Sequence, residues 1–313
     1  MSAQPLRVAV VGVGHVGRHH ARILCDMPGV TLTGILDLNR QRATEIAAAC
    51  QTQVLTDAAA LPDLVDAVTI AVPTASHVSV ARPLLERGIP VLIEKPLARS
   101  VGEAAALLDV AQRAGATIAV GHTERFNPAV AAARQYLHAP RFIECHRLGT
   151  FSERSLDIDV VFDLMIHDLD VLLSLVDSEV ASIDAVGVPV LTPKIDIANV
   201  RLRFASGCIA NLTASRISRD RIRKIRFFQT DSYVSVDYGS QELEVWRLVR
   251  PPAGVPVIEG GKQPVVTEEP LKRELQDFVE AVRDRRPPTV TGDAGRRALD
   301  LAQKITEQMT KVG

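Results

Sequence analysis

The segment RVAVVGVGHVGRHHARILC, residues 7–25, decides the fold of this chain. Its first residues are apolar and β-branched, which predicts a buried strand, and its last residues have the spacing of a helix. Between them, GVGHVG carries glycines in the spacing G-x-G-x-x-G. That spacing is informative when it follows a strand and opens a helix, as it does here. The segment therefore predicts the first turn of a dinucleotide-binding fold.

Each glycine of this motif has a separate physical task. Gly12 permits a tight turn, Gly14 lets the backbone approach a pyrophosphate, and Gly17 lets the helix pack close to the strand. The start of the helix then offers N–H groups and a partial positive charge to the phosphates. We predict a phosphate site here that also includes His15 and Val16, which lie between the glycines.

Asp37 lies twenty residues after Gly17, at the end of the second predicted strand. A carboxylate at this position binds the adenosine ribose hydroxyls and repels a 2′-phosphate, so the sequence favours NAD over NADP. Arg40 and Arg42 follow closely and weaken that preference, because a guanidinium attracts phosphate. We include Leu38 and Arg42 with Asp37 in the predicted cofactor site.

The rest of the chain divides into two patterns. Up to about residue 120, uniformly apolar strands alternate with helices, which predicts a parallel sheet covered on both faces. From residue 141 to about 248, strands of period two are separated by tight turns, and two helices close the chain. We expect an α/β protein whose residues 1–122 form a Rossmann domain with a doubly wound parallel sheet. Residues 123–313 are expected to form an α+β domain with a large, open, antiparallel-rich sheet, and the stretch 251–270 predicts no element.

Composition excludes several classes of function. The 313 residues are 47% hydrophobic and 23% charged with a net charge of −1, so neither a nucleic-acid nor a membrane-surface partner is expected. No apolar run approaches the roughly 20 residues that span a bilayer. The N-terminus lacks a basic segment followed by a cleavage site, and the four separated cysteines form no C-x-x-C pair. We expect an unprocessed cytoplasmic protein with reduced thiols.

Two further loops are expected at the carboxyl ends of strands, where an open α/β sheet binds its ligands. One is AVPTASH, residues 71–77, and the other is EKP, residues 94–96. A Lys-Pro step can hold a cis peptide bond and so fix the direction of the lysine side chain. The alternative interpretation is that Lys95 is an ordinary surface lysine. The predicted cofactor contacts from these loops are Ala71, Val72, Pro73, Thr74, His77, Glu94, Lys95 and Pro96.

A third motif, FDLMIHDLDVLLSL at residues 162–175, has apolar residues at helical spacing. Asp163, His167 and Asp170 recur on one face at i, i+4 and i+7. A solvated stripe is the ordinary interpretation of such a face. A catalytic face is the alternative, because a histidine titrates near neutral pH and a neighbouring acid can orient it.

Taken in order, GVGHVGRHHA, AVPTASH, EKPLARS, GHTERFNPA and FDLMIHDLD resemble the motifs of the Gfo/Idh/MocA oxidoreductases over the whole chain. The resemblance implies an NAD-dependent dehydrogenase acting on CH–OH groups, and a homodimer or homotetramer formed through the C-terminal sheet. It implies catalytic roles for Lys95, His167 and Asp163, with His167 favoured over Lys95 as the base. Asp170 matches a family acid whose role, structural or functional, stays open. We expect no metal, because hydride transfer needs none.

The stretch GHTERFNPAV, residues 121–130, resembles the corresponding stretch of UDP-N-acetylglucosamine 3-dehydrogenases in this family. That resemblance implies oxidation of the sugar C3 hydroxyl, with a downstream aminotransferase in the biosynthesis of the diamino sugar of lipid A. The expected substrate contacts are Lys95, His122, Glu124, Arg125, Asn127, Asp163 and His167. For Arg125 a salt bridge is the alternative, and for His122 a core position. The alternative functions are an inositol or free-sugar dehydrogenase and a non-catalytic NAD-binding regulator.

Overall fold

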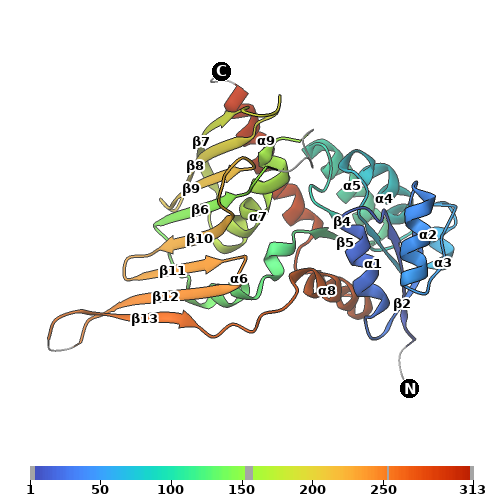
Figure 1. Ribbon diagram of the computed structural model, residues 1–313, viewed down its shortest axis with the longest axis horizontal. Helices are drawn as coiled ribbons and strands as arrows, with labels where there is room; N and C mark the ends of the chain where they lie inside the picture. The colour runs from blue at the N-terminus through green and yellow to red at the C-terminus, as the bar shows by residue number, and fades with distance from the viewer. Residues whose placement is uncertain (1–3, 152–157, 252–253, 311–313) are drawn as a thin grey trace. The chain divides into compact units, whose positions relative to one another are not determined.

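The computed structural model describes residues 4–151, 158–251 and 254–310, and the chain divides into two compact units (Figure 1). The first unit comprises Met1–His122 and Leu271–Leu299, and the second comprises Thr123–Pro270 and Asp300–Gly313. Both these units and the expected domains divide the chain after residue 122. The expected second domain, however, contained the whole remainder of the chain, whereas residues 271–299 lie in the first unit.

The first unit is built on a five-stranded sheet in the order β2-β1-β3-β4-β5, and every neighbouring pair is parallel. The strands are β1 (Leu6–Val11), β2 (Val30–Leu36), β3 (Ala67–Ile70), β4 (Val91–Glu94) and β5 (Ile118–Gly121). The helices that follow them are α1 (Gly17–Cys25), α2 (Arg40–Ala49), α3 (Leu61–Leu64), η1 (Thr74–Ser76), α4 (His77–Glu86) and α5 (Val101–Ala114). Strands β3, β4 and β5 are buried along their whole length, which requires cover on both faces. The predicted doubly wound parallel sheet is confirmed.

Helix α8 (Pro270–Asp284) explains why residues 271–299 belong to the first unit. Its apolar side chains recur at three- and four-residue spacing, and Leu275 and Phe278 join the core cluster that contains Val8 of β1. Burying each such side chain stabilises the fold by about 1.5 to 3 kcal/mol. The last helix, α9 (Gly292–Thr310), begins in the first unit and ends in the second.

The second unit is built on an eight-stranded sheet in the order β13-β12-β11-β10-β6-β9-β8-β7. All neighbouring pairs are antiparallel except β6 with β9, so the predicted antiparallel-rich sheet is confirmed. The strands are β6 (Phe142–Leu148), β7 (Val180–Val188), β8 (Ile197–Phe204), β9 (Ile209–Ser215), β10 (Ile222–Phe228), β11 (Ser232–Asp237), β12 (Glu242–Val249) and β13 (Val257–Gln263). The helical segments are η2 (Thr123–Phe126), α6 (Pro128–Ala133), η3 (Arg134–Tyr136), η4 (Val161–Met165) and α7 (Ile166–Leu175).

Strand β13 lies in the stretch 251–270, for which the sequence predicts no element. It reads VIEGGKQ, and its two glycines and mostly exposed residues give no period-two signal. Its pairing with β12 makes it a strand: Gly260 lies opposite Trp246, and a Cβ on Gly260 would come within 2.0 Å of the Val245 carbonyl oxygen. Glycine is therefore required by the close approach of β12, a long-range contact that the local sequence does not reveal.

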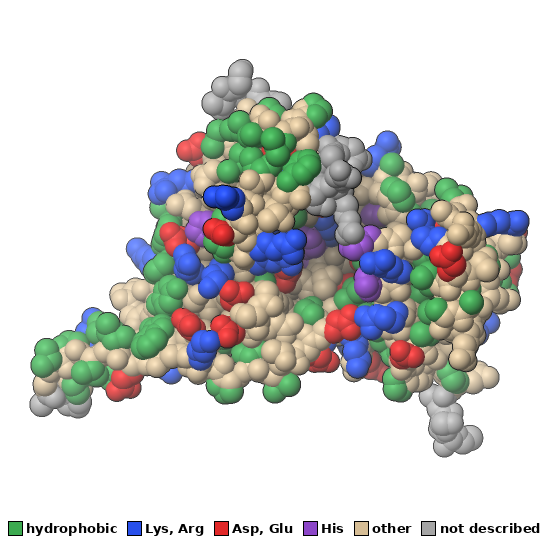
Figure 2. All heavy atoms as spheres, viewed as in Figure 1, with side chains coloured by type: hydrophobic (Ala, Val, Ile, Leu, Met, Phe, Trp, Pro, Cys, Tyr) green, Lys and Arg blue, Asp and Glu red, His purple; other side chains and the backbone are tan. Residues whose placement is uncertain are grey.

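The two faces of this sheet differ in burial. Strand β8 alternates between buried and exposed residues, so one of its faces is covered and the other meets solvent. Helix α6 packs against β11 and β12 (Figure 1). Figure 2 shows hydrophobic side chains along the β12–β13 hairpin, where Val249, Val257 and Ile258 are exposed. Among the described residues, no helix is both long enough and apolar enough to cross a membrane.

Candidate active site

The glycine loop joins β1 to α1 and has the geometry that its motif predicts. Gly12 has a φ of +85°, which favours glycine, and a Cβ there would lie 2.8 Å from the Ala71 backbone. A Cβ on Gly17 would lie 1.8 Å from the Gly12 carbonyl oxygen, so the helix and strand approach too closely for a side chain. At Gly14, by contrast, no atom of the described residues apart from its two chain neighbours lies within 4 Å of the Cβ position. The loop therefore has room for a pyrophosphate at the start of α1.

Asp37 follows β2 and lies beside the glycine loop. Its carboxylate accepts the Val13 N–H at 2.7 Å and the Asn39 N–H at 2.7 Å, and Arg42 donates to both oxygens at 2.8 and 3.0 Å. Although burial raises the pKa of Asp37, these hydrogen bonds and the Arg42 charge lower it below its ordinary value. Leu38, next in the chain, is fully exposed. An ionised carboxylate beside the glycine loop is what recognition of a ribose requires.

The loops after β3 and β4 are neighbours because their strands pair. Lys95 is half-buried, whereas Glu94 and Pro96 on either side of it are buried. The Lys95–Pro96 peptide bond is cis, as the Lys-Pro step allows. His77 is buried at the start of α4, with Nδ1 3.0 Å from the Pro96 carbonyl oxygen and Nε2 3.0 Å from the Val72 carbonyl oxygen. The two loops are therefore joined through His77.

A buried cluster in the first unit consists of His20, Glu94 and Glu274, each of which places a potential ligand atom within 4.8 Å of the other two. Among the described residues, these three side chains are close enough together to hold a metal ion. His20 Nε2 lies 3.1 Å from Glu94 Oε1, so two of its three members already contact each other. His122, which is expected to contact the substrate, is fully buried directly after β5.

In the second unit, the helix predicted at residues 162–175 is a π-helical turn, η4, followed by α7. Asp163 lies in the π turn and His167 in the first turn of α7, and both side chains are half-buried. Single π turns within helices are common at functional sites. Asp170 differs from Asp163 and His167 in its burial, because it is only 2% exposed. Its Oδ1 lies 3.4 Å from Arg125 Nη1. Burial lowers the pKa of Arg125, and the charge of Asp170 opposes that shift.

Sequence reasoning missed a buried polar cluster in this unit. Arg147 on β6 donates to the Asp168 carboxylate at 2.6 and 2.8 Å and to Glu124 at 3.0 Å, and its guanidinium lies 5.1 Å from the Tyr238 ring centroid. Burial alone lowers the pKa of Arg147, but the charges of Asp168 and Glu124 raise it well above its ordinary value. A signal existed, because Arg147 occupies a buried position in the alternating pattern of β6.

Asn127 makes three side-chain hydrogen bonds, one of which runs from its Nδ2 to Glu124 Oε2 at 3.4 Å. The side chain is 1% exposed, its Nδ2 donates to the Tyr238 carbonyl at 3.0 Å, and its Oδ1 accepts the Ala129 N–H at 3.1 Å. The bond to the Ala129 N–H caps helix α6. These bonds fix the start of α6 next to Glu124 and Arg125, and a substrate contact from Asn127 stays a prediction.

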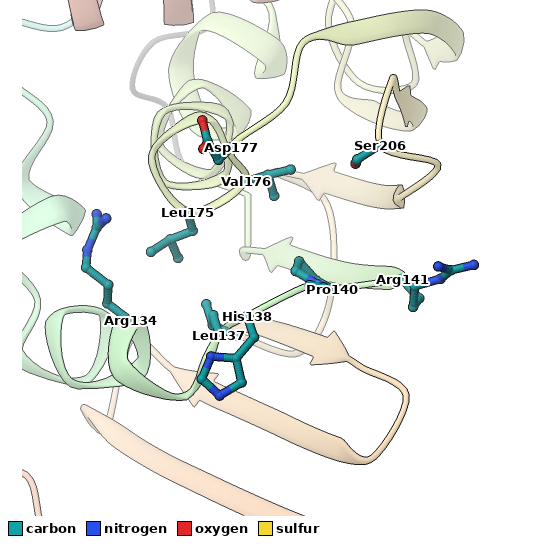
Figure 3. Close-up of a pocket in the computed structure, with 10 residues that line it drawn as sticks. Arg134, Leu137, His138, Pro140, Arg141, Leu175, Val176, Asp177 and Ser206 are labelled. Carbon is teal, nitrogen blue, oxygen red and sulfur yellow. The ribbon is translucent and has the colours of Figure 1, made fainter.

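A cavity of about 330 Å³ lies at the C-terminal end of α7 (Figure 3). The side chains of Leu137 and Leu175 point towards one another across it. Leu175 lies eight positions after His167, which corresponds to about 12 Å along an α-helix. The described residues that line this cavity include none of the predicted site residues. The cavity is thus distinct from the Asp163 and His167 end of the helix.

Comparison with known proteins agrees with this geometry. A family model described as an oxidoreductase family with an NAD-binding Rossmann fold matches residues 6–122, and the model of the GFO/IDH/MocA C-terminal domain matches residues 130–234. The UDP-N-acetylglucosamine 3-dehydrogenase of Acidithiobacillus ferrooxidans is 39% identical over 302 residues, which is 96% of each chain. A solved structure of that enzyme superimposes with a TM-score of 0.91, at 38% identity over 98% of each chain.

Other relatives match less completely or less closely. The inositol 2-dehydrogenase of Mycolicibacterium smegmatis is 36% identical over 193 residues, 57% of this chain and 55% of that protein. A probable dehydrogenase from Thermotoga maritima shares the fold, with a TM-score of 0.83 at 21% identity over 98% of each chain. The family models cover most of the chain, and the first of them spans the glycine loop. The chain therefore belongs to the Gfo/Idh/MocA oxidoreductases, and its N-terminal unit carries their NAD-binding Rossmann fold.

Proposed function

We propose that this protein is an NAD-dependent dehydrogenase that oxidises the C3 hydroxyl of UDP-N-acetylglucosamine to a ketone. The observation that carries the proposal is the identity of 39% over 96% of both chains with a UDP-N-acetylglucosamine 3-dehydrogenase. Identity spread over both units supports a common substrate as well as a common fold. The match to an inositol 2-dehydrogenase, by comparison, covers 57% of the chain.

The oxidation removes the hydrogen on C3 as a hydride and the hydroxyl hydrogen as a proton, which leaves a carbonyl. NAD, when bound, accepts the hydride and becomes NADH. We assign His167 as the base that accepts the proton, and the charge of Lys95 as the group that stabilises the developing alkoxide. In the alternative assignment, Lys95 is the base. We assign Asp163, four residues before His167, to orienting the imidazole or binding a neighbouring hydroxyl.

The nucleotide end of the substrate carries a diphosphate, which we assign to Arg125. Its planar guanidinium suits recognition of phosphate oxygens, and its side chain is half-buried beside Asp170. His122, Glu124 and Asn127 are retained in the proposed substrate site. For Glu124 and Asn127 the proposed contacts would be added to the hydrogen bonds that they already make.

The proposal extends to a pathway partner, an assembly and a location. A 3-keto nucleotide sugar is a substrate for an aminotransferase, which would carry the product towards the diamino sugar of lipid A. The exposed apolar side chains of Val249, Val257 and Ile258 on the eight-stranded sheet support a homodimer or homotetramer formed through that sheet. The four cysteines form no disulfide, which supports a reducing, cytoplasmic location.

The second candidate function is that of an inositol 2-dehydrogenase, which the 36% identity to the Mycolicibacterium smegmatis enzyme favours. That reaction needs the same hydride and proton transfers but no contact to a diphosphate. A non-catalytic NAD-binding regulator is the third candidate, and it differs from both in forming no NADH.

The test is a substrate comparison with the purified protein. It is incubated with NAD and, in parallel, with UDP-N-acetylglucosamine, inositol or glucose, and a carbonyl trap removes the ketone because alcohol oxidation is uphill at neutral pH. NADH formation with the nucleotide sugar alone supports the proposal. NADH formation with inositol or glucose instead retains the dehydrogenase chemistry and refutes the substrate. NAD binding without NADH formation from any of the three supports the regulator.

A further inference from the structure

We propose that His20 and His77 are positioning residues that hold the Lys95 loop, residues 94–96, from two sides. The proposal rests on the role of Lys95 in the proposed function. Both imidazoles lie inside the first unit, with exposures of 0% and 1%, and we assign His77 to holding this loop in place of the cofactor contact that its motif predicts. Each contacts the residue on one side of Lys95, whose own side chain is half-buried.

The first support acts through Glu94, the last residue of β4. His20 Nε2 lies 3.1 Å from Glu94 Oε1, and Glu94 Oε2 accepts the Lys95 N–H at 3.3 Å. A Cβ on Gly121 of β5 would lie 2.8 Å from Glu94 Oε1, so the carboxylate occupies the space that a side chain would take there. Although burial raises the pKa of Glu94, the hydrogen bond with His20 and the charges of His20 and Lys95 lower it below its ordinary value. The Glu94 carboxylate is therefore fixed between α1 and β5.

The second support acts through Pro96, on the other side of Lys95. The Pro96 carbonyl oxygen lies 3.0 Å from His77 Nδ1, and the opposite ring nitrogen lies 3.0 Å from the Val72 carbonyl oxygen. The His77 ring thus spans the gap between the loop after β3 and the loop after β4. Burial lowers the pKa of His77, and a neutral imidazole has one N–H, so the ring donates to one of these carbonyl oxygens and packs against the other.

The two supports connect the Lys95 loop to the elements that form the cofactor site. His20 lies three residues after Gly17 in α1, the helix that opens at the glycine loop, and Val72 lies in the predicted cofactor loop after β3. Displacing a reacting group by about 1 Å can lower a rate by roughly 100-fold. Rigid support of the backbone on both sides of Lys95 therefore holds the ammonium group in a fixed position relative to the glycine loop and the loop after β3.

The experiment compares His20→Leu, His20→Gln, His77→Leu and His77→Gln with the wild type. Thr52→Val is the matched control, because it removes a half-buried side-chain bond to a backbone carbonyl (Thr52 Oγ1 to Leu32 O, 2.7 Å) at β2, the other end of the sheet. Thermal unfolding establishes that each variant is folded, and the NAD dissociation constant, kcat and KM are then measured with UDP-N-acetylglucosamine.

A second readout is independent of the substrate. The chain has seven lysines, so reductive methylation with ¹³C-formaldehyde gives few resonances, and Lys95→Arg identifies the one from Lys95. The pH titration of that resonance reports the surroundings of the Lys95 ammonium group in each variant, whether or not the nucleotide sugar is the substrate.

We expect both leucine variants to lower kcat by about 10- to 100-fold and to shift the Lys95 titration, with NAD affinity within about threefold of wild type. His20→Gln keeps the donor to Glu94 and restores kcat, whereas His77→Gln keeps a donor but not the ring that lies between both carbonyl groups, and restores kcat only in part. If a leucine variant does not fold, these two glutamine variants decide the matter. Folded variants with wild-type kcat and Lys95 titration would overturn the proposal. A wild-type protein that forms no NADH from the nucleotide sugar refutes the proposed function alone, and the Lys95 titration still tests the positioning role.

Discussion

Asp37 and Arg42 form an ion pair at the end of β2, in which the single nitrogen Nη2 of Arg42 lies 2.8 and 3.0 Å from the two carboxylate oxygens. The acid that is expected to exclude a 2′-phosphate therefore lies beside an arginine that would attract one. The carboxylate also accepts the Val13 N–H, which ties it to the glycine loop. We expect cofactor preference in this protein to depend on which member of the pair faces the adenosine ribose.

Replacement of Asp37 is expected to change this preference. In Asp37→Ala the ribose hydroxyls lose their acceptor and Arg42 loses its partner, so NAD binds more weakly and NADP more tightly. The ratio of the two dissociation constants should shift by at least about tenfold towards NADP. Arg42→Ala is the control, because it retains the carboxylate and should leave NADP disfavoured. An unchanged ratio in Asp37→Ala, measured by titration calorimetry, contradicts the ribose role.

Lys95 and His167 are expected to affect turnover far more than cofactor binding. In Lys95→Met and His167→Asn, kcat should fall by about 10² to 10⁴, the usual effect of removing a general acid–base group, while the NAD dissociation constant changes little. Lys304→Met and His138→Asn are matched controls, since both residues are exposed and outside the predicted site. Steady-state kinetics that leave kcat at the wild-type value in both test variants would refute the assignment.

The buried Arg147–Asp168 pair is expected to be important for stability. Asp168→Ala leaves a buried guanidinium without its bidentate partner, so the free energy of unfolding should fall by about 3 to 5 kcal/mol. The exposed pair of Lys304 and Asp300 supplies the comparison, and Asp300→Ala should cost less than about 1 kcal/mol. Urea unfolding followed by circular dichroism distinguishes the two, and equal effects would mean that the Arg147 cluster is not the stronger interaction.

Asp196 is expected to make stability depend on pH. It is fully buried and accepts the N–H groups of Val190, Leu191 and Thr192, and although burial raises its pKa, these bonds lower it to about 2. Because this value is below that of the unfolded chain, the carboxylate stabilises the fold above about pH 4, and the stabilisation is lost as the pH falls towards 2. Asp196→Asn should therefore melt at a lower temperature than the wild type at neutral pH. Melting temperatures of the wild type and Asp196→Asn that do not converge as the pH falls towards 2 would rule out this contribution of Asp196 to stability.

The local features of the fold could be predicted because short-range physics determines them. The turn at Gly12, the close packing at Gly17 and the acid at Asp37 follow from a motif within some thirty residues, and the structure bears out the strand–turn–helix around it. The parallel sheet followed from strands that are apolar on both faces. Lys95 and the helix with Asp163 and His167 could be selected as candidates because family motifs mark them.

Other features depend on contacts between distant segments. Strand β13 exists because Gly260 fits against β12, and α8 joins the first unit because Leu275 and Phe278 pack into its core. Neither partner is visible in the local sequence. The pairing of Arg147 with Asp168, which joins β6 to α7, is likewise a contact between distant segments. For the same reason, the sequence predicts substrate contacts for Glu124 and Asn127 but not their structural hydrogen bonds to Arg147 and Tyr238.

The most direct test of the central claim is to follow the hydrogen on the reacting carbon. UDP-N-acetylglucosamine carrying deuterium at C3 of the sugar is incubated with the protein and NAD, and the reduced cofactor is analysed by mass spectrometry. The account predicts that the deuterium is transferred to the nicotinamide and that NADH formation is slower than with the unlabelled sugar. Reduced cofactor without deuterium would mean that another carbon is oxidised, and the absence of any reduced cofactor would contradict the proposed dehydrogenase activity on this substrate.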